Sequence, residues 1–135
     1  MGDETRSVRE VEHGSSEELA QLLLNSAGEG IYGIDLDGNC TFANPACLKL
    51  LGVDNDSDVL GKHMHNLAHH TRANGAPYPV EECRIYQALR EREGTHVDDE
   101  VMFCSDGTSF PAEYWSYPIM RDGQVVRLCR HVRRH

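Results

Sequence analysis

Residues 31–45 read IYGIDLDGNCTFANP, and this stretch decides the fold. Two short β-prone runs flank Asp37-Gly38, a dipeptide that favours a tight hairpin turn because both of its residues tolerate positive φ. Asn44-Pro45 follows directly, with a good N-cap residue and then a proline suited to the first helical position. The stretch therefore predicts a β-hairpin that leads straight into a helix.

The C-terminal part of the chain repeats the hairpin signal. Further Asp-Gly turns lie at 106–107 and 122–123. They separate three predicted strands, at 95–103, 108–120 and 124–132. Such short connections join antiparallel neighbours, and an antiparallel sheet of this size needs a cover on one face. The only segment available as a cover lies between residues 44 and 94, so the sequence predicts an α+β domain.

The covering segment predicts short helices separated by polar turns. A helix at 46–51 is followed at 59–70 by one or two helical turns. A longer helix begins at Glu81 and Glu82, whose charges favour a helix N-terminus, and it ends before Gly94.

An apolar helix is predicted ahead of the hairpin. We divide the chain into a flexible leader at 1–14, an N-terminal amphipathic helix at 15–28 and a single domain at 29–135. The helix begins with Ser15-Ser16-Glu17-Glu18, which fits a capping box. Leu19, Leu22 and Leu23 then form an apolar stripe at helical spacing.

The charge balance limits the partners of the protein. The chain has 135 residues, with 13 Lys+Arg against 22 Asp+Glu and a formal net charge of −9. This balance disfavours nucleic acid or an anionic membrane as the main partner. No apolar run approaches the roughly 20 residues of a spanning helix, so we expect a cytoplasmic protein without membrane contact. Residues 121–135 carry a net +4, and we expect their arginines to contact an acidic partner subunit or following domain.

The cysteines predict neither a disulfide framework nor a zinc knuckle. There are five, at positions 40, 47, 83, 104 and 129, and no C-x-x-C occurs. Most lie in apolar or periodic contexts, where a free cysteine behaves as a small hydrophobe. We therefore expect reduced thiols.

The ordered set of elements and motifs resembles a PAS domain over about residues 16–133. The motifs that carry the resemblance are SAGEGIYGIDLDG at 26–38, FANPA at 42–46, LLG at 50–52, VLGK at 59–62, DGTSFPAEY at 106–114 and PI at 118–119. The resemblance implies a five-stranded antiparallel sheet in the order 2-1-5-4-3, short helices on one face and an N-terminal flanking helix. It also implies a cavity between sheet and helices that holds a small ligand in many members of the family.

The resemblance also suggests which side chains face that cavity. Period-two alternation on the last two strands, mapped onto flavin-binding members, and the tyrosine of the longer helix give a candidate ligand pocket: Ala112, Tyr114, Ser116, Leu128, Arg130 and Tyr86. A buried Arg130 would need a carboxylate or an anionic ligand, which suits a small carboxylate-bearing effector. The alternative is a slip of strand register that leaves Arg130 in solvent.

Four histidines crowd one segment, at positions 63, 65, 69 and 70. His65 and His69 are four residues apart, so on a helix they would share a face and could bind a metal or a haem iron. Haem-binding relatives place this histidine on the longer helix, where residues 81–93 contain none. The alternative is a polar, partly exposed helix surface.

Flavin photochemistry is not expected. Light-sensing relatives carry a reactive cysteine in an Asn-Cys-Arg-type motif on a helix, whereas Asn39-Cys40 lies on a predicted strand. Cys83 follows a proline-containing loop at a helix start, where it either packs or has a lowered pKa. The resemblance is therefore to PAS domains without that motif.

The outer face of the sheet predicts an interface. Trp115 and Tyr117 point there by alternation, Met102 is placed with them, and an apolar patch of this kind marks an interface. The leucine-rich helix, from the same chain or a partner, is the natural cover. This predicts a homodimer through Leu19, Leu22, Leu23, Trp115 and Tyr117.

No enzyme motif is present, neither a nucleophile elbow nor a P-loop nor HExxH. Together with this, the resemblance implies a bacterial two-component or similar signalling role without catalysis. We expect a ligand-binding sensory module of a histidine kinase, cyclic-di-GMP enzyme or chemoreceptor, which relays its state by dimer rearrangement to a downstream output domain. A ligand-free dimerisation module and a haem-based gas or redox sensor are the alternatives.

Overall fold

The computed structural model describes residues 18–20 and 22–135. The predicted leader at 1–14 and the first residues of the predicted helix, 15–17, lie outside the described residues. The elements that follow the N-terminal helical turns are β1 (Gly30–Ile34), β2 (Cys40–Ala43), α2 (Pro45–Leu51), η1 (Asp56–Asp58), α3 (Met64–Ala68), η2 (Val80–Glu82), α4 (Arg84–Glu91), β3 (Thr95–Phe103), β4 (Ser109–Arg121) and β5 (Gln124–Arg134).

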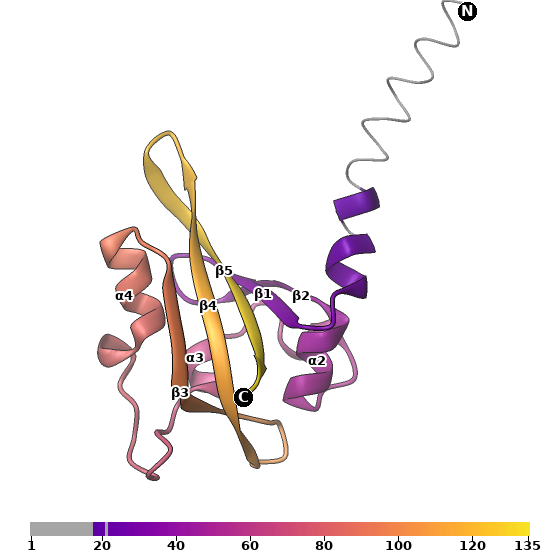
Figure 1. Ribbon diagram of the computed structural model, residues 1–135, viewed down its shortest axis with the longest axis vertical. Helices are drawn as coiled ribbons and strands as arrows, with labels where there is room; N and C mark the ends of the chain where they lie inside the picture. The colour runs from indigo at the N-terminus through magenta and orange to yellow at the C-terminus, as the bar shows by residue number, and fades with distance from the viewer. Residues whose placement is uncertain (1–17, 21) are drawn as a thin grey trace, which may run out of the picture.

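One antiparallel sheet organises the molecule, in the order β2-β1-β5-β4-β3. The predicted α+β fold and strand order are confirmed. In Figure 1 the β4–β5 hairpin is the longest pair and its tip extends beyond the rest of the sheet. The register of β5 pairs Arg130 with Tyr32 on one side and with Ser116 on the other. The central strand β5 therefore brings the two halves of the chain together.

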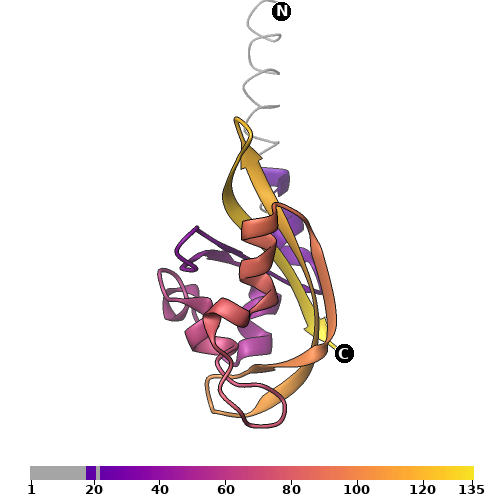
Figure 2. The same ribbon diagram turned by 90° about the vertical axis from the view of Figure 1, so that its left-hand side faces the viewer.

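The short helices lie on one side of this sheet, as Figure 2 shows. The core fills the space between them and consists mainly of apolar and aromatic side chains. Its largest fully buried members on the sheet are Tyr32, Met102, Phe110, Tyr114, Leu128 and Arg130. This inner face of the sheet, together with the helical cover, is where a ligand site has to be sought.

Asn44 holds the start of α2 against the first hairpin. Its side-chain oxygen accepts hydrogen bonds from the backbone N–H of Cys47 at 3.0 Å and of Ile31 at 2.8 Å. Its amide nitrogen donates to the carbonyl oxygens of Leu24 at 2.8 Å and Glu29 at 3.1 Å. The predicted N-cap is therefore confirmed, and the same side chain also anchors the end of the N-terminal helical turns.

The longer helix differs from the prediction at both ends. Glu81 and Glu82 form a separate turn, η2, and α4 begins only at Arg84. The helix ends at Glu91, and its C-cap Arg92, two residues before Gly94, adopts the left-handed conformation with φ 62°. Pro79 precedes η2 in an extended conformation, so the chain enters the helical segment through a tight turn.

The N-terminal helical turns leave their apolar side chains uncovered. Leu19, Leu22 and Leu23 are 56%, 63% and 62% exposed, so the chain's own sheet does not cover them. Across the described residues, no helix combines the length and apolar character needed to cross a bilayer.

Candidate functional site

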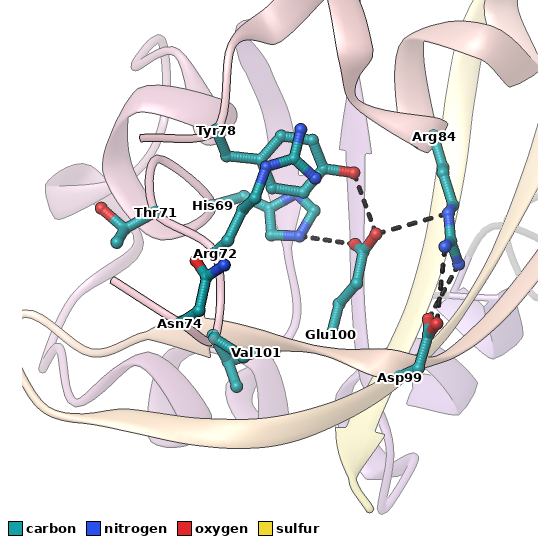
Figure 3. A pocket seen from close by; sticks show the side chains of 10 residues that line it. His69, Thr71, Arg72, Asn74, Tyr78, Arg84, Asp99, Glu100 and Val101 are labelled. Atoms are coloured by element: carbon teal, nitrogen blue, oxygen red, sulfur yellow. Dashed lines mark hydrogen bonds and ion pairs between the residues drawn. The ribbon is translucent and has the colours of Figure 1, made fainter. Parts of the chain in front are cut away.

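A cavity of about 260 Å³ lies between β3 and the helical cover (Figure 3). Its wall is mostly polar and comes from the end of α3, the following loop, α4 and β3. The residues that line it are His69, Thr71, Arg72, Ala73, Asn74, Tyr78, Arg84, Asp99, Glu100 and Val101.

Glu100 is the centre of this wall, and contacts from four segments converge on its carboxylate. Tyr114 donates to Oε1 at 2.6 Å, and His69 Nε2 lies 2.8 Å from the same oxygen. Tyr78 donates to Oε2 at 2.9 Å, and Arg84 Nε lies 3.5 Å from it. Figure 3 shows His69, Tyr78 and Arg84 directed at this carboxylate. The cavity wall is thus bonded to β4 through Tyr114.

A β-bulge turns Glu100 inward. The pairing of β3 with β4 shifts register between Val97 and Glu100. Both Val97 and Met102 are buried, although strict alternation would place them on opposite faces. The prediction that Met102 lies on the outer face is therefore wrong, because the bulge reverses the alternation in the second half of the strand.

Burial and hydrogen bonding fix the protonation of this network. Burial alone would raise the pKa of Glu100, but hydrogen bonds, first from His69 and then from Tyr114, lower it well below its usual range. Burial lowers the pKa of His69, so its imidazole is neutral near pH 7. Burial and the Glu100 carboxylate raise the pKa of Tyr78, which keeps its hydroxyl a donor. The Glu100 carboxylate therefore lies among neutral donors and the Arg84 guanidinium, with Asp99 as a second carboxylate of the cavity wall.

Arg130 is buried behind this wall, with 1% of its surface exposed. Its guanidinium lies 4.1 Å from the ring centre of Tyr114 and 5.0 Å from that of Tyr32, and it donates a hydrogen bond to the Tyr32 hydroxyl. Its Nε and Nη2 have no hydrogen-bond partner, and no carboxylate of the described residues lies within ion-pair distance. The alternative of a solvent-exposed Arg130 is therefore wrong.

The other predicted pocket residues are packed rather than open. Ala112, Tyr114, Ser116 and Leu128 are buried on the inner face with Arg130. Tyr86 is half-buried, and its hydroxyl lies 2.7 Å from His63 Nε2. None of these six lines the cavity beside Glu100. Their role in ligand binding stays a prediction, and the sequence analysis missed Tyr78, Arg84 and Glu100 as neighbours of the cavity.

The four histidines of this segment differ in exposure. His65 and His69 are buried, and the structure places them with Cys83, so that one ligand atom from each lies within 4.8 Å of the others. His63 instead caps α3, where its Nδ1 accepts from the backbone N–H of Asn66 at 3.3 Å. His70 is exposed. Haem ligation by His65 and His69 stays a prediction.

The outer face is partly covered by its own side chains. His96 stacks on Trp115 at 4.9 Å, and the Arg133 guanidinium lies 5.3 Å from the same ring. Arg133 also pairs with Glu113 at 2.6 Å. This arginine therefore has an acidic neighbour in its own chain, and contact of the C-terminal arginines with a partner stays a prediction. Tyr117 remains 48% exposed, and the dimer interface stays a prediction.

Comparisons with known proteins agree with this geometry. The family described as the PAS fold matches residues 18–131. The sensor protein CitS of Halalkalibacterium halodurans is 32% identical over 106 residues, which cover 73% of this chain and 20% of that protein. The chain thus spans about a fifth of the length of this curated relative.

Solved structures show the same fold. The PAS domain of an HTR-like protein from Haloarcula marismortui has a TM-score of 0.70 at 19% identity and covers 97% of this chain and 99% of its own. The PAS domain of nitrogen regulation protein NR(II) from Vibrio parahaemolyticus has a TM-score of 0.68 at 18% identity, with coverages of 87% and 98%. A Light-Oxygen-Voltage domain studied with a flavin analogue has a TM-score of 0.65 at 20% identity, with coverages of 87% and 84%.

Proposed function

The chain belongs to the PAS family, and from that premise we propose that it is the sensory module of a histidine-kinase type of sensor protein, whose state is set by a small carboxylate-bearing ligand in the cavity beside Glu100. The observation that carries the proposal is the convergence of four segments on the Glu100 carboxylate. A molecule that enters the cavity meets a wall already bonded to the sheet.

The Arg84 guanidinium is the part of the wall that can bind a small carboxylate. Arg84 forms a two-pronged pair with Asp99, at 2.8 and 3.4 Å. Both side chains are substantially exposed, so the pair contributes only about 0–1 kcal/mol. A ligand carboxylate can therefore take the guanidinium from Asp99 at little cost. The volume of about 260 Å³ matches a small metabolite.

The contacts of Glu100 provide a route for the signal. Tyr114 lies on β4, and its hydroxyl donates a hydrogen bond to Glu100. The Arg130 guanidinium stacks on the ring of the same tyrosine. Arg130 belongs to β5, whose end is the C-terminal end of the domain. A ligand that draws Arg84 away from Glu100 would shift the balance between two arrangements of β4 and β5, and an output domain beyond the strand would read the difference.

Binding of small carboxylates tests the proposal. We expect at least one of lactate, succinate and malate to raise the melting temperature of the chain, because a ligand that binds only the folded state stabilises it. The Arg84→Met variant should bind that compound at least about tenfold more weakly, since it lacks the guanidinium. The matched control on the same helix is Arg90→Met, which should bind as the wild type does. The proposal fails if none of the three compounds shifts the wild-type melting temperature, or if Arg84→Met responds equally.

A second candidate function, dimerisation without a ligand, rests on the uncovered leucines of the N-terminal helical turns. We expect the wild type to be a dimer and the double variant Leu22→Gln/Leu23→Gln to be a monomer, as measured by light scattering during gel filtration. The control is Leu36→Gln, because Leu36 is 57% exposed but lies in the β1–β2 turn. A monomeric wild type, or a double variant of unchanged mass, contradicts this interface.

A further inference from the structure

We propose that His65, His69 and Cys83 form a binding site for a transition-metal ion of the zinc type. The three side chains are 4%, 1% and 0% exposed, and one ligand atom from each lies within 4.8 Å of the others. His65 lies on α3 and His69 is its C-cap, whereas Cys83 is the N-cap of α4. Two helix ends therefore bring two imidazoles and one thiol to the same point of the interior.

The Nε2 atom of each imidazole lies beside an oxygen that can accept a hydrogen bond. His65 Nε2 lies 2.6 Å from the carbonyl oxygen of Tyr78, and His69 Nε2 lies 2.8 Å from Glu100 Oε1. Because the Tyr78 carbonyl oxygen can only accept, the His65 ring carries its proton on Nε2 and presents a lone pair on Nδ1. The Glu100 carboxylate beside His69 Nε2 favours the same tautomer in that ring. A ligating histidine characteristically donates its other N–H to a carbonyl or a carboxylate, and here one ring has each kind of partner.

The Nδ1 atom of His65 is unpaired, whereas that of His69 forms a hydrogen bond with Cys83 Sγ. His65 Nδ1 is buried and has no hydrogen-bond partner. A buried acceptor left unpaired destabilises the fold by about 1–3 kcal/mol, so it calls for a ligand. His69 Nδ1 lies 3.3 Å from Cys83 Sγ, and a cation between the nitrogen and the sulfur would bind both.

The charges of the site favour a cation that can displace one proton. Burial lowers the pKa of His65 and of His69, so both rings are neutral and free to ligate near pH 7. Burial raises the pKa of the Cys83 thiol, so the sulfur is protonated before the metal arrives. Binding then forms the metal–sulfur bond, breaks the S–H bond and releases one proton to solvent. The Glu100 carboxylate offsets part of the remaining positive charge.

The donor set selects the metal. Two imidazole nitrogens and one thiolate suit Zn²⁺, which binds nitrogen at about 2.0–2.1 Å and sulfur at about 2.3 Å. Tetrahedral ligand atoms then lie roughly 3.3–3.8 Å apart, so the widest present separation must close by about 1 Å. Three protein ligands leave a fourth position for water or a small ligand.

This site goes beyond the proposed function and does not depend on it. His69 faces Glu100 and the cavity through Nε2, and faces Cys83 through Nδ1. Zinc binding with no response to carboxylates would overturn the proposed function alone. A carboxylate response without zinc binding would overturn the metal site alone.

A metal titration of the full chain tests the site. After treatment with a chelator and removal of any tag, the wild type should bind one equivalent of Zn²⁺ in competition with a chromophoric chelator. Cys83→Ser and His65→Gln should each bind at least about 100-fold more weakly, because each removes one of three protein ligands. The matched controls, Cys129→Ser and His70→Gln, should bind as the wild type does.

The outcomes separate a built site from surface histidines. Equal zinc affinity in Cys83→Ser and the wild type, or no binding by the wild type, overturns the proposal. Should Cys83→Ser fail to fold, the wild type loaded with Co²⁺ decides the question. A four-coordinate spectrum with a thiolate-to-cobalt charge-transfer band supports the site, whereas a six-coordinate spectrum without that band overturns it.

Discussion

Replacing Glu100 with alanine should lower the free energy of unfolding by about 3–5 kcal/mol, as measured by urea denaturation. The Glu100 side chain is 11% exposed and holds contacts from His69, Tyr78 and Tyr114. Truncation would leave these buried donors without an acceptor, and unpaired buried polar groups are strongly destabilising. The control is Asp98→Ala on the same strand, where the side chain is exposed and a change within about 0.5 kcal/mol is expected. A loss below about 1 kcal/mol for Glu100→Ala would show that the network contributes little.

The same carboxylate should make stability depend on pH. Burial raises its pKa, but the hydrogen bonds, led by the one from His69, outweigh burial and lower the pKa from 4.5 to about 2. Because the folded-state pKa is the lower one, this contribution is complete above pH 4.5 and is lost as the pH falls toward 2. In the Glu100→Gln variant, the free energy of unfolding should lack this part of its decrease at acidic pH. If the free energy of unfolding changes with pH in the same way for the wild type and the variant over that range, the low pKa of Glu100 is contradicted.

Replacing Arg130 with methionine should raise the free energy of unfolding by roughly 1–3 kcal/mol. The guanidinium is buried without a carboxylate among the described residues, so its desolvation is not offset by an ion pair. Methionine has a similar length and fills the space between Tyr32 and Tyr114 without a charge. This increase in stability is reduced because the Tyr32 hydroxyl loses the hydrogen bond that Arg130 donates to it.

A double variant separates the two effects. In Arg130→Met/Tyr32→Phe both partners of the hydrogen bond are apolar, so this protein should be more stable than Arg130→Met alone. The matched single control is Arg127→Met, an exposed position on the same strand, with an expected change within about 0.5 kcal/mol. If Arg130→Met unfolds more readily than the wild type, the stacking on Tyr114 outweighs the desolvation of the charge. An arginine that destabilises the folded domain is best explained by an anionic partner in another state.

Local sequence signals predicted the sheet because they act between neighbours in the chain. The Asp-Gly turns set the three hairpins, and Asn44-Pro45 set the start of α2. Alternation on β5 correctly placed Leu128, Arg130 and Val132 on the inner face, since that strand pairs without a break around them. In these stretches, turn chemistry and period-two burial both agree with the final structure.

The centre of the site could not be predicted from such local signals. Glu100 reads as an outward residue until the bulge reverses its face, and neither glycine nor proline marks that bulge in the sequence. The spacing of His65 and His69 predicted that they share a helix face, but the loop that follows them brings Cys83 alongside. That contact depends on the tertiary packing of two short helices. Each helix has too few turns for an apolar period in the sequence to show which face is buried.

The hydrogen bonds of Asn44 bear on how this domain can be moved between proteins. Its amide binds the carbonyl oxygens of Leu24 and Glu29, while its oxygen holds the N–H groups of Ile31 and Cys47. The folded unit therefore begins before the first strand, inside the preceding helical turns. A chimeric protein that takes this domain only from residue 29 onward would lose the Leu24 carbonyl oxygen, which is one of the two acceptors of the Asn44 amide. A transplant that starts upstream of Leu24 would carry the module across with its anchoring intact.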